Sequence, residues 1–316
     1  HHLIIDAVSW RVILDDLNYL YDHSDDVDVD LPLKSTSFKQ WAMELNEYKD
    51  SSAFKNQSKF WDDTIVFLKK QNKSEQDTFN FRKDSIFIDN EVISDGMNRA
   101  KEIFGADSSA ILLAALLDVL TDYLPNKTII NMEGHGRTLS SKNIAVERTV
   151  GWFTAIYPLV VEKQFDISSS IMNIKDKLKR ASQSQIEFGL MKNKDRFTYR
   201  PNLTFNYLGE FTEEINNSNT FSLSKQSTGE VKDKKNYLKS DFVVDIINYG
   251  DGFNFNFTVV EKININFEKV EMELKNYFLN LKDKLNCYDQ KVITQSDVSD
   301  EELESEIWKE LTDLYN

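Results

Sequence analysis

The stretch that constrains this chain most is its first eleven residues, His1-His2-Leu3-Ile4-Ile5-Asp6-Ala7-Val8-Ser9-Trp10-Arg11. Two histidines and a carboxylate within six residues are more ionisable side chains than a segment of hydrophobic core usually carries. We predict that one imidazole is free for proton transfer and that Asp6 holds the local turn. The alternatives are a tag remnant and a core histidine bonded to backbone. Apolar residues follow the histidines directly, which argues against a tag, because a remnant more often leads into a polar linker.

From Val8 the sequence predicts a helix, because apolar residues recur at i, i+3 and i+4 spacing as far as Tyr21. The stretch from His1 to Asp6 therefore lies on the loop that enters this helix. Unpaired backbone N–H groups at such a helix start favour a nearby negative charge. The acidic residues 22–30 end the helix and predict a solvated loop.

Composition excludes several classes of protein. The 316 residues carry 38 Lys and Arg against 52 Asp and Glu, a net charge of −14, so we predict no nucleic-acid partner and no anionic membrane surface. No apolar run approaches the roughly 18–20 residues of a membrane span. The single cysteine, Cys287, excludes an internal disulfide and is compatible with a reducing cytosol, so we predict a cytoplasmic protein. With four histidines and no Cys-x-x-Cys or His-Glu-x-x-His motif, no metal site is predicted.

Helical and strand patterns alternate irregularly, which favours a mixed, layered α/β fold over a bundle or a sandwich. Strong turn residues, Gly250-Asp251-Gly252, predict a β-hairpin. Further strands are predicted at 85–88, 128–132 and 203–209. Further helices are predicted at 38–48, 54–68, 94–104, 110–123, 167–181 and 270–285.

The strand at 128–132 delivers Glu133-Gly134-His135-Gly136-Arg137, a carboxylate, an imidazole and a guanidinium at one strand end. The two glycines allow a tight backbone path there, because glycine adopts conformations that other residues avoid. We interpret this cluster as a candidate site. A second cluster, residues 148–161, either lines a pocket or forms an aromatic hinge that packs two sheets.

These stretches resemble, in the same order, the motifs of epimerization domains of nonribosomal peptide synthetases, which are relatives of condensation domains. Residues 1–11 resemble the His-His-x-x-x-Asp motif followed by Ser-Trp-Arg. The remaining matches are Leu-Pro-x-Lys-x-Thr-Ser-Phe-x-x-Trp at 31–41, Glu-Gly-His-Gly-Arg at 133–137, Arg-Thr-Val-Gly-Trp-Phe-Thr-x-x-Tyr-Pro at 148–158 and Phe-Asn-Tyr-Leu-Gly-x-Phe at 205–211. Each motif is short, but together they are specific and span most of the chain.

The resemblance implies two chloramphenicol-acetyltransferase-like lobes in a V shape, with the N-terminal lobe only partly present. Residues 1–76 would be the remainder of that lobe, 77–292 the C-terminal lobe and 293–316 an acidic docking helix. The family binds no metal or pyridoxal cofactor directly. A phosphopantetheine arm on an upstream peptidyl carrier protein would bring in the aminoacyl or peptidyl thioester.

The resemblance also assigns roles for the L-to-D inversion at Cα. His2 and Glu133 match the family's acid/base pair, and we expect burial to raise the pKa of Glu133. Asp6 is expected to order the histidine loop through Arg11 or Arg137. Supporting roles fall to His135, Arg137, Asn206 and Tyr207, although Tyr207 fits a core role equally well. Trp10 and Trp152 are expected to pack.

Two features depart from the family pattern or extend it. The family's Gly-x-Gly-Tyr-Gly motif appears only as residues 185–189, which puts one wall of the site in doubt, and Ala7 replaces a usual glycine. Residues 294–316 resemble a communication-mediating donor segment for a downstream synthetase subunit, or else they pack on their own domain. A condensation-type acyltransferase acting through His2 and an inactive docking scaffold remain open as alternative functions.

Overall fold

The computed structural model describes residues 4–26, 28–71, 80–139, 144–195, 197–210, 238–299 and 308. All strands described within these ranges form one mixed six-stranded sheet in the order β1-β6-β5-β4-β2-β3. β2 and β5 run parallel to β4, and the other neighbours are antiparallel. The strands are β1 (Phe81–Asp89), β2 (Lys127–Gly134), β3 (Ala155–Glu162), β4 (Leu203–Glu210), β5 (Phe242–Asn248) and β6 (Gly252–Val260). The predicted mixed α/β fold and the β5–β6 hairpin are confirmed.

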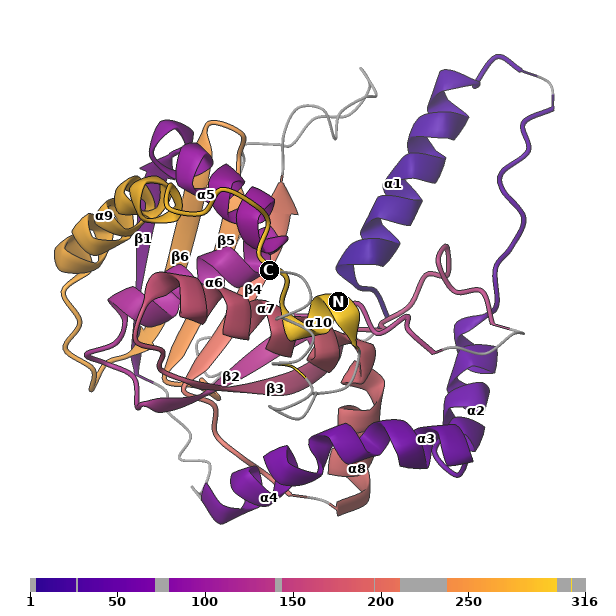
Figure 1. The fold of residues 1–316 in the computed structure, drawn as a ribbon. Helices are drawn as coiled ribbons and strands as arrows, with labels where there is room; N and C mark the ends of the chain where they lie inside the picture. Colours follow the sequence, from indigo (N-terminus) through magenta and orange to yellow (C-terminus); the bar gives the residue numbers. More distant parts are fainter. Residues whose placement is uncertain are drawn as a thin grey trace.

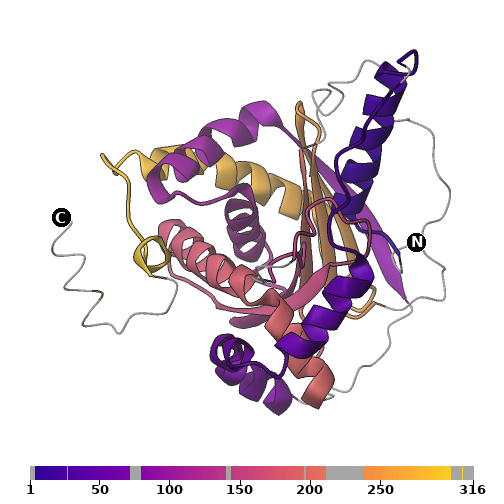
Figure 2. The same ribbon diagram turned by 90° about the vertical axis from the view of Figure 1, so that its right-hand side faces the viewer.

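One face of the sheet is covered by helices, as Figures 1 and 2 show. These helices are α5 (Asn90–Phe104), α6 (Ser108–Val119), α7 (Ile167–Gln183) and α9 (Phe267–Leu285). Alternate strand residues point into this layer, including Phe205, Val244 and Phe255, each at most 1% exposed. Each such side chain contributes about 1.5–3 kcal/mol when fully buried. This layer is the main core of the protein.

The opposite face of the sheet carries the side chains between the core positions, since successive residues of a strand point to opposite faces, and many of them are polar. Asn206 on β4 lies opposite Asp245 on β5, which in turn lies opposite Asn256 on β6. All of them are partly exposed, whereas their core-facing neighbours on the same strands are buried. We call this surface the open face of the sheet.

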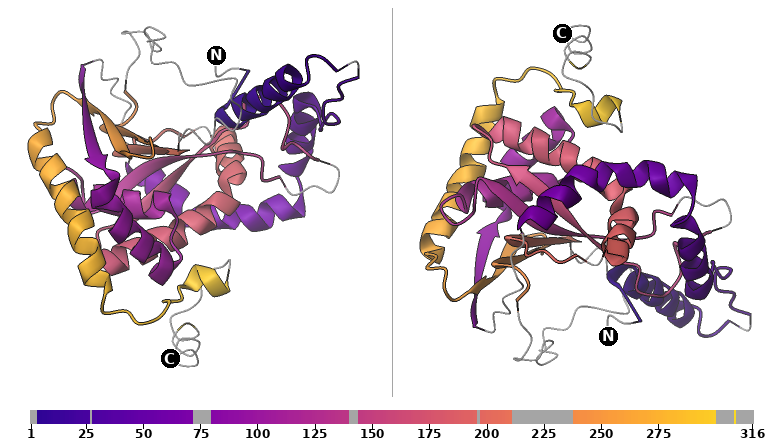
Figure 3. Two further views of the ribbon diagram at one scale, coloured as in Figure 1. Left: turned by 90° about the horizontal axis from the view of Figure 1, so that it is seen from above. Right: turned by 90° about the horizontal axis from the view of Figure 1, so that it is seen from below.

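The N-terminal helices lie to one side of the sheet lobe and are α1 (Ala7–Asp22), α2 (Phe38–Tyr48), α3 (Ser52–Gln57), the 3₁₀ turn η1 (Ser58–Trp61) and α4 (Asp62–Gln71). Figures 1 and 3 show α1 and α2 on the side of the molecule away from α9. Trp61, Ile65 and Leu68 nevertheless belong to the main core. The domain boundary at residue 76 stays a prediction, but the packing joins α4 to the sheet lobe.

Several predicted boundaries and burials are wrong. The helix at 54–68 is split at η1, which lets the Trp61 indole donate to the Ser184 carbonyl oxygen at 2.6 Å. Phe60, an aromatic residue within the predicted 54–68 helix, is 42% exposed. The helix predicted to reach 123 ends at Val119, and the Thr121 and Tyr123 amides beyond it bond carbonyl oxygens three residues back. α5 begins four residues earlier than predicted, directly after β1.

Candidate active site

Asp6 is the N-cap of α1 and is only 2% exposed. One carboxylate oxygen accepts hydrogen bonds from the Ser9 amide (2.8 Å) and the Ser9 hydroxyl (2.7 Å), and the other accepts from the Phe153 amide (3.1 Å). A cap of this kind satisfies amides that the first turn of a helix leaves unpaired. Asp6 therefore fixes the start of α1 and ties it to the 148–153 stretch.

Arg137 completes this network from the other candidate motif. Its guanidinium donates to both oxygens of Asp6, at 2.6 and 3.2 Å, and the two side chains are 5% and 3% exposed. Burial alone would raise the pKa of Asp6, but hydrogen bonds from Arg137 and Ser9 outweigh it and lower that pKa. The contact predicted between Asp6 and Arg137 is present, and Arg137, not Arg11, supplies it.

Arg137 also gathers the backbone of the second cluster. It donates to the carbonyl oxygens of Val146 (3.2 Å) and Thr149 (3.0 Å), and its guanidinium carbon lies 4.1 Å from the centre of the Phe153 ring. Such a cation over an aromatic face adds electrostatic attraction. The 148–153 stretch is thus held by the same arginine that holds Asp6. Whether residues 148–161 line a pocket or form an aromatic hinge, the 148–153 part of this cluster packs against the candidate site.

The 31–41 segment packs on the same network. Thr36 exchanges backbone and side-chain hydrogen bonds with Ala145, and the Thr149 hydroxyl donates to the Thr36 carbonyl oxygen at 2.6 Å. The rings of Phe38 and Trp41 pack edge-on or tilted against Phe153, with centroids 5.0 and 4.8 Å apart from it. The motifs at 6–9, 31–41, 133–137 and 148–153 therefore converge in space, although more than a hundred residues separate the first two from the last.

Gly136 leaves no room for a side chain. Gly136 has a φ of +64°, and a β-carbon there would lie 1.7 Å from the Phe153 carbonyl oxygen. At Gly134 a β-carbon would lie 1.8 Å from the Gln185 side-chain oxygen, which a flexible glutamine side chain can relieve by moving. Gln185 accepts from the Gly136 amide (3.3 Å) at the start of α8 (Gln185–Asp195). The departure from the family pattern at 185–189 thus places a glutamine side chain against the turn.

His135 and Glu133 point away from this buried network. The His135 Nδ1 accepts from the Arg137 amide at 3.1 Å, and burial and the nearby Arg137 charge lower the pKa of His135. Glu133 lies on β2, with its side chain exposed. The burial expected for Glu133 is therefore wrong for this chain.

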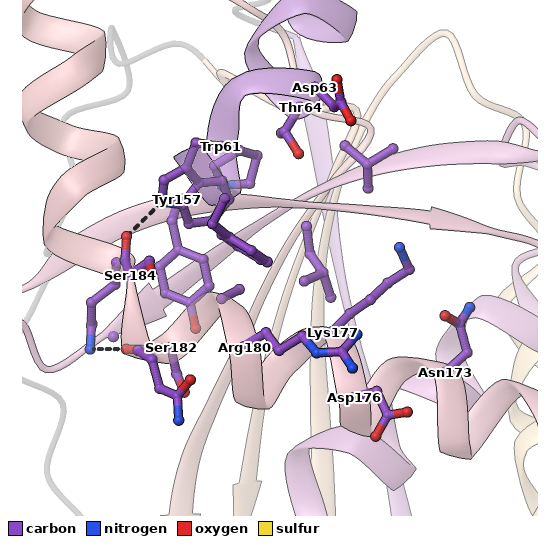
Figure 4. A pocket seen from close by; sticks show the side chains of 18 of the residues that line it. Trp61, Asp63, Thr64, Tyr157, Asn173, Asp176, Lys177, Arg180, Ser182 and Ser184 are labelled. Atoms are coloured by element: carbon purple, nitrogen blue, oxygen red, sulfur yellow. Dashed lines mark hydrogen bonds between the residues drawn. The ribbon is translucent and has the colours of Figure 1, made fainter. Parts of the chain in front are cut away.

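Glu133 borders a large groove of about 1890 Å³. Figure 4 shows its walls, with Trp61 and Tyr157 on one side and Lys177 and Arg180 of α7 on the other. Gly134 and His135 line the same groove, so the Glu-Gly-His-Gly turn opens into it. The volume exceeds the roughly 300–1,000 Å³ typical of a small-ligand pocket, which leaves room for an extended chain.

Asn206 and Tyr207 do not share a face. Asn206 lies on the open face, and β4 is the strand next to β2, which carries Glu133. Tyr207 faces the helical layer, packs against the main core and stacks on Phe253 with ring centroids 6.4 Å apart. Burial raises the pKa of Tyr207, although hydrogen bonds with Ser108 and Asn248 act in the opposite sense. The core alternative for Tyr207 is favoured by this placement.

Other expected residues fall differently. His2 lies outside the described residues. Trp10 and Trp152, expected to pack, are 53% and 38% exposed.

Sequence reasoning missed the pair formed by Tyr48 and Glu187. The Tyr48 hydroxyl contacts a Glu187 carboxylate oxygen at 2.5 Å and so links α2 to α8. Burial raises the pKa of Glu187. No motif marks this pair, since its residues are 139 positions apart.

In the part of the chain that the structure describes, no group of three or more His, Cys, Asp or Glu side chains could hold a metal ion. No helix among the described residues has the length and apolar character to cross a membrane.

The profile of the condensation-domain family matches residues 1–297, so the chain belongs to this enzyme family. Gramicidin S synthase 1 of Brevibacillus brevis is 28% identical over 345 residues, which cover 99% of this chain and 31% of that protein. Bacitracin synthase 1 of Bacillus licheniformis is 30% identical over 243 residues, which cover 73% of this chain and 5% of that protein. The chain spans about a third or less of the length of these curated relatives.

Solved structures share the fold. The epimerization domain from the third module of tyrocidine synthetase B superposes with a TM-score of 0.73 at 22% identity, covering 91% of this chain and 68% of that domain. The first condensation domain of the CDA synthetase gives 0.60 at 13% identity, covering 95% and 64%. The fold is therefore that of condensation-family domains.

Proposed function

We propose that this chain inverts Cα of an aminoacyl or peptidyl thioester, carried by the phosphopantetheine arm of an upstream carrier protein, from L to D. The observation that carries the proposal is the placement of Glu133. Glu133 is among the residues that line a groove large enough for an extended arm, and it lies four residues before Arg137, which forms a buried ion pair with Asp6. The match of residues 1–297 to the condensation family and the likeness of the fold to an epimerization domain support the same function.

The reaction needs two proton transfers at one carbon. A base removes the Cα proton from one face, which leaves an enolate, and an acid returns a proton to the opposite face. The thioester makes the Cα proton more acidic, yet the enolate oxygen still needs stabilisation. Glu133 and His2 are the proposed pair, each contributing about 10²–10⁴ in rate if it acts as a general acid or base.

The buried network has a positioning role in this scheme. Asp6 lies four residues after His2, and its contacts with Ser9, Phe153 and Arg137 fix the backbone at that point. Arg137 lies four residues after Glu133 and fixes the other motif. One ion pair therefore sets the relative position of the two segments that carry the proposed acid/base groups. Asn206, on the open face, is a candidate donor to the thioester or enolate oxygen.

The test is solvent deuterium incorporation at Cα of a carrier-bound L-aminoacyl thioester, followed by chiral analysis. We expect incorporation by the wild-type chain and its loss in Glu133→Gln and His2→Ala. Glu102→Gln, an exposed carboxylate on α5 paired with Arg99, is the matched control. Incorporation that survives Glu133→Gln would remove Glu133 from the mechanism.

A condensation-type acyltransferase is the second candidate, because the matching family and several similar structures are condensation domains. It predicts peptide-bond formation between two carrier-bound substrates that requires His2 and tolerates Glu133→Gln. If the wild type and all variants catalyse neither epimerization nor peptide-bond formation, that result would favour a docking scaffold. A downstream synthetase subunit is the proposed partner of the C-terminal segment.

A further inference from the structure

The backbone that follows β2 leaves the sheet before the Glu-Gly-His-Gly turn is complete. β2 pairs with β3 as far as Gly134, which lies opposite Ala155. The Gly136 amide, two residues further on, is buried and donates to the Gln185 side-chain oxygen at 3.3 Å. A buried amide beyond the last strand pair needs an acceptor from elsewhere in the fold, because an unpaired buried N–H group is costly. A side chain of α8 supplies that acceptor here.

Gln185 is only 2% exposed, and its side chain is held at both ends. The side-chain nitrogen donates to the Ser182 carbonyl oxygen at 2.9 Å, while the side-chain oxygen accepts from the Gly136 amide. Figure 4 shows that the adjoining Ser184 is bonded in turn to Trp61, whose indole donates to the Ser184 carbonyl oxygen at 2.6 Å. An amide side chain with its donor and its acceptor both engaged has one orientation. Gln185 therefore presents a fixed acceptor to the turn.

The helix that receives the second of these bonds is itself anchored. Ser182 lies in the last turn of α7. The C-terminal part of the chain packs along this helix, where Lys175 donates to Asp297 at 2.6 Å. Residues 294–298, which include the short helix α10 (Gln295–Val298), are therefore packed on their own domain. Gln185 thus connects the turn to a well-packed part of the protein.

The turn that Gln185 contacts carries two of the candidate site residues, Glu133 and His135, and both line the groove. Gln185 lies against Gly134 and bonds Gly136, the two glycines on either side of His135. Glycine restricts the backbone less than any other residue, so a turn built on two glycines has to be fixed by contacts from outside it. The contacts of Gln185 are of this kind.

We infer that Gln185 is a positioning residue for Glu133 and His135 and that it acts through the backbone of residues 134–136. The Gly-x-Gly-Tyr-Gly pattern that residues 185–189 resemble has glycine at position 185, and glycine has no side chain with which to accept this bond. The contact is therefore a feature of this sequence. Its effect on catalysis rests on the proposed function, whereas the ordering of the turn does not.

Two substitutions separate the hydrogen bond from the space that Gln185 fills. Gln185→Met keeps the length of the side chain but offers no N–H donor and only a weak acceptor. Gln185→Gly removes the side chain altogether. In both variants of the full chain we expect amide hydrogen exchange at Gly136, followed by NMR and measured relative to Ile246 of β5, to be about tenfold faster, the change that loss of one hydrogen bond produces. Gln290→Met, which replaces an exposed glutamine, is the matched control and should leave this ratio unchanged.

A kinetic measurement separates positioning from a purely structural role. Deuterium incorporation at Cα of the carrier-bound L-aminoacyl thioester would be followed over a range of carrier concentrations. A base that is held loosely loses turnover rather than substrate binding, so kcat should fall about tenfold in both Gln185 variants while KM changes less than about twofold. Gln290→Met should match the wild type in both constants.

An unchanged exchange ratio at Gly136 in Gln185→Met would overturn the inference, and so would a raised ratio with an unchanged kcat. If exchange at Ile246 also becomes faster in Gln185→Gly, that variant has lost global stability and Gln185→Met decides. If the wild type incorporates no deuterium at Cα, the proposed function fails, and the exchange ratio at Gly136 still decides whether Gln185 orders the turn.

Discussion

The ion pair between Asp6 and Arg137 allows a sharp test of how the site is held together. Asp6→Asn keeps a side-chain oxygen that can cap α1, because Asn and Asp are equally good caps. It removes the negative charge, however, and leaves a guanidinium that is only 5% exposed without its counter-ion. Breaking a buried pair in this way costs about 3–5 kcal/mol. We expect the lower end, about 3 kcal/mol, because the amide oxygen still accepts one hydrogen bond from Arg137.

Asp166 provides a matched control within the same chain. It caps α7 with the same pair of hydrogen bonds, from the Ser169 amide (2.9 Å) and the Ser169 hydroxyl (2.6 Å), but it is exposed. Asp166→Asn should therefore change the free energy of unfolding by less than about 1 kcal/mol. The difference between the two variants isolates the contribution of burial beside Arg137.

Urea unfolding at neutral pH, followed by circular dichroism and intrinsic fluorescence, measures both variants. The double variant Asp6→Asn with Arg137→Met should recover part of the loss, because an apolar side chain removes the unpaired charge. Equal losses for Asp6→Asn and Asp166→Asn would refute the reasoning, since the pair would then contribute nothing beyond an ordinary helix cap.

Three more outcomes follow from particular contacts. The pKa of Asp6 is lowered from 3.8 in the folded protein, so its contribution to stability is full above that value and is lost as pH falls through the folded pKa. When the free energy of unfolding is measured against pH, Asp6→Asn should therefore lose less stability below about pH 4 than the wild type does. Gly136→Ala should lower the free energy of urea unfolding by at least about 1–3 kcal/mol, because it combines a positive φ with a clash against backbone. Gly189→Ala should raise the same free energy by up to about 1 kcal/mol, because alanine suits a helix better than glycine and nothing lies within 4 Å of the added β-carbon. Lys175→Met should release the Asp297 anchor at a cost of about 1–3 kcal/mol and make the chain after residue 293 cleavable by protease at lower enzyme concentration.

Periodicity was sufficient for most of the fold. The apolar stripe of α7, including Ile171, Ile174 and Leu178, is buried as predicted. The alternating residues of the β5–β6 hairpin also face the core as predicted. The Ser37 cap of α2 accepts from the Gln40 amide, as its position before the helix indicates. These features depend on neighbours in sequence, so a single chain is enough to predict them.

The errors concern contacts made across the chain. The strand alternation of β4 puts Asn206 and Tyr207 on opposite faces, but which face carries the helices depends on the order of the strands in the sheet. The exposure of Trp10 depends on which elements pack against α1, and the spacing of apolar residues along the sequence does not predict those contacts. Gln185 meets Gly134 only because α8 begins beside β2, which no local pattern indicates.

The charged groups of the two motifs divide into two kinds, and this division argues for the proposed chemistry. Asp6 and Arg137 are buried and bonded to each other through both carboxylate oxygens, so both side chains are committed to holding the two motifs together. Glu133 lies four residues before Arg137 in the same motif, yet it is exposed and lines the groove. The ion pair therefore holds the backbone of both motifs still while leaving one carboxylate accessible. A base that must meet a thioester on a mobile arm requires that combination, because its position has to be fixed before the substrate arrives.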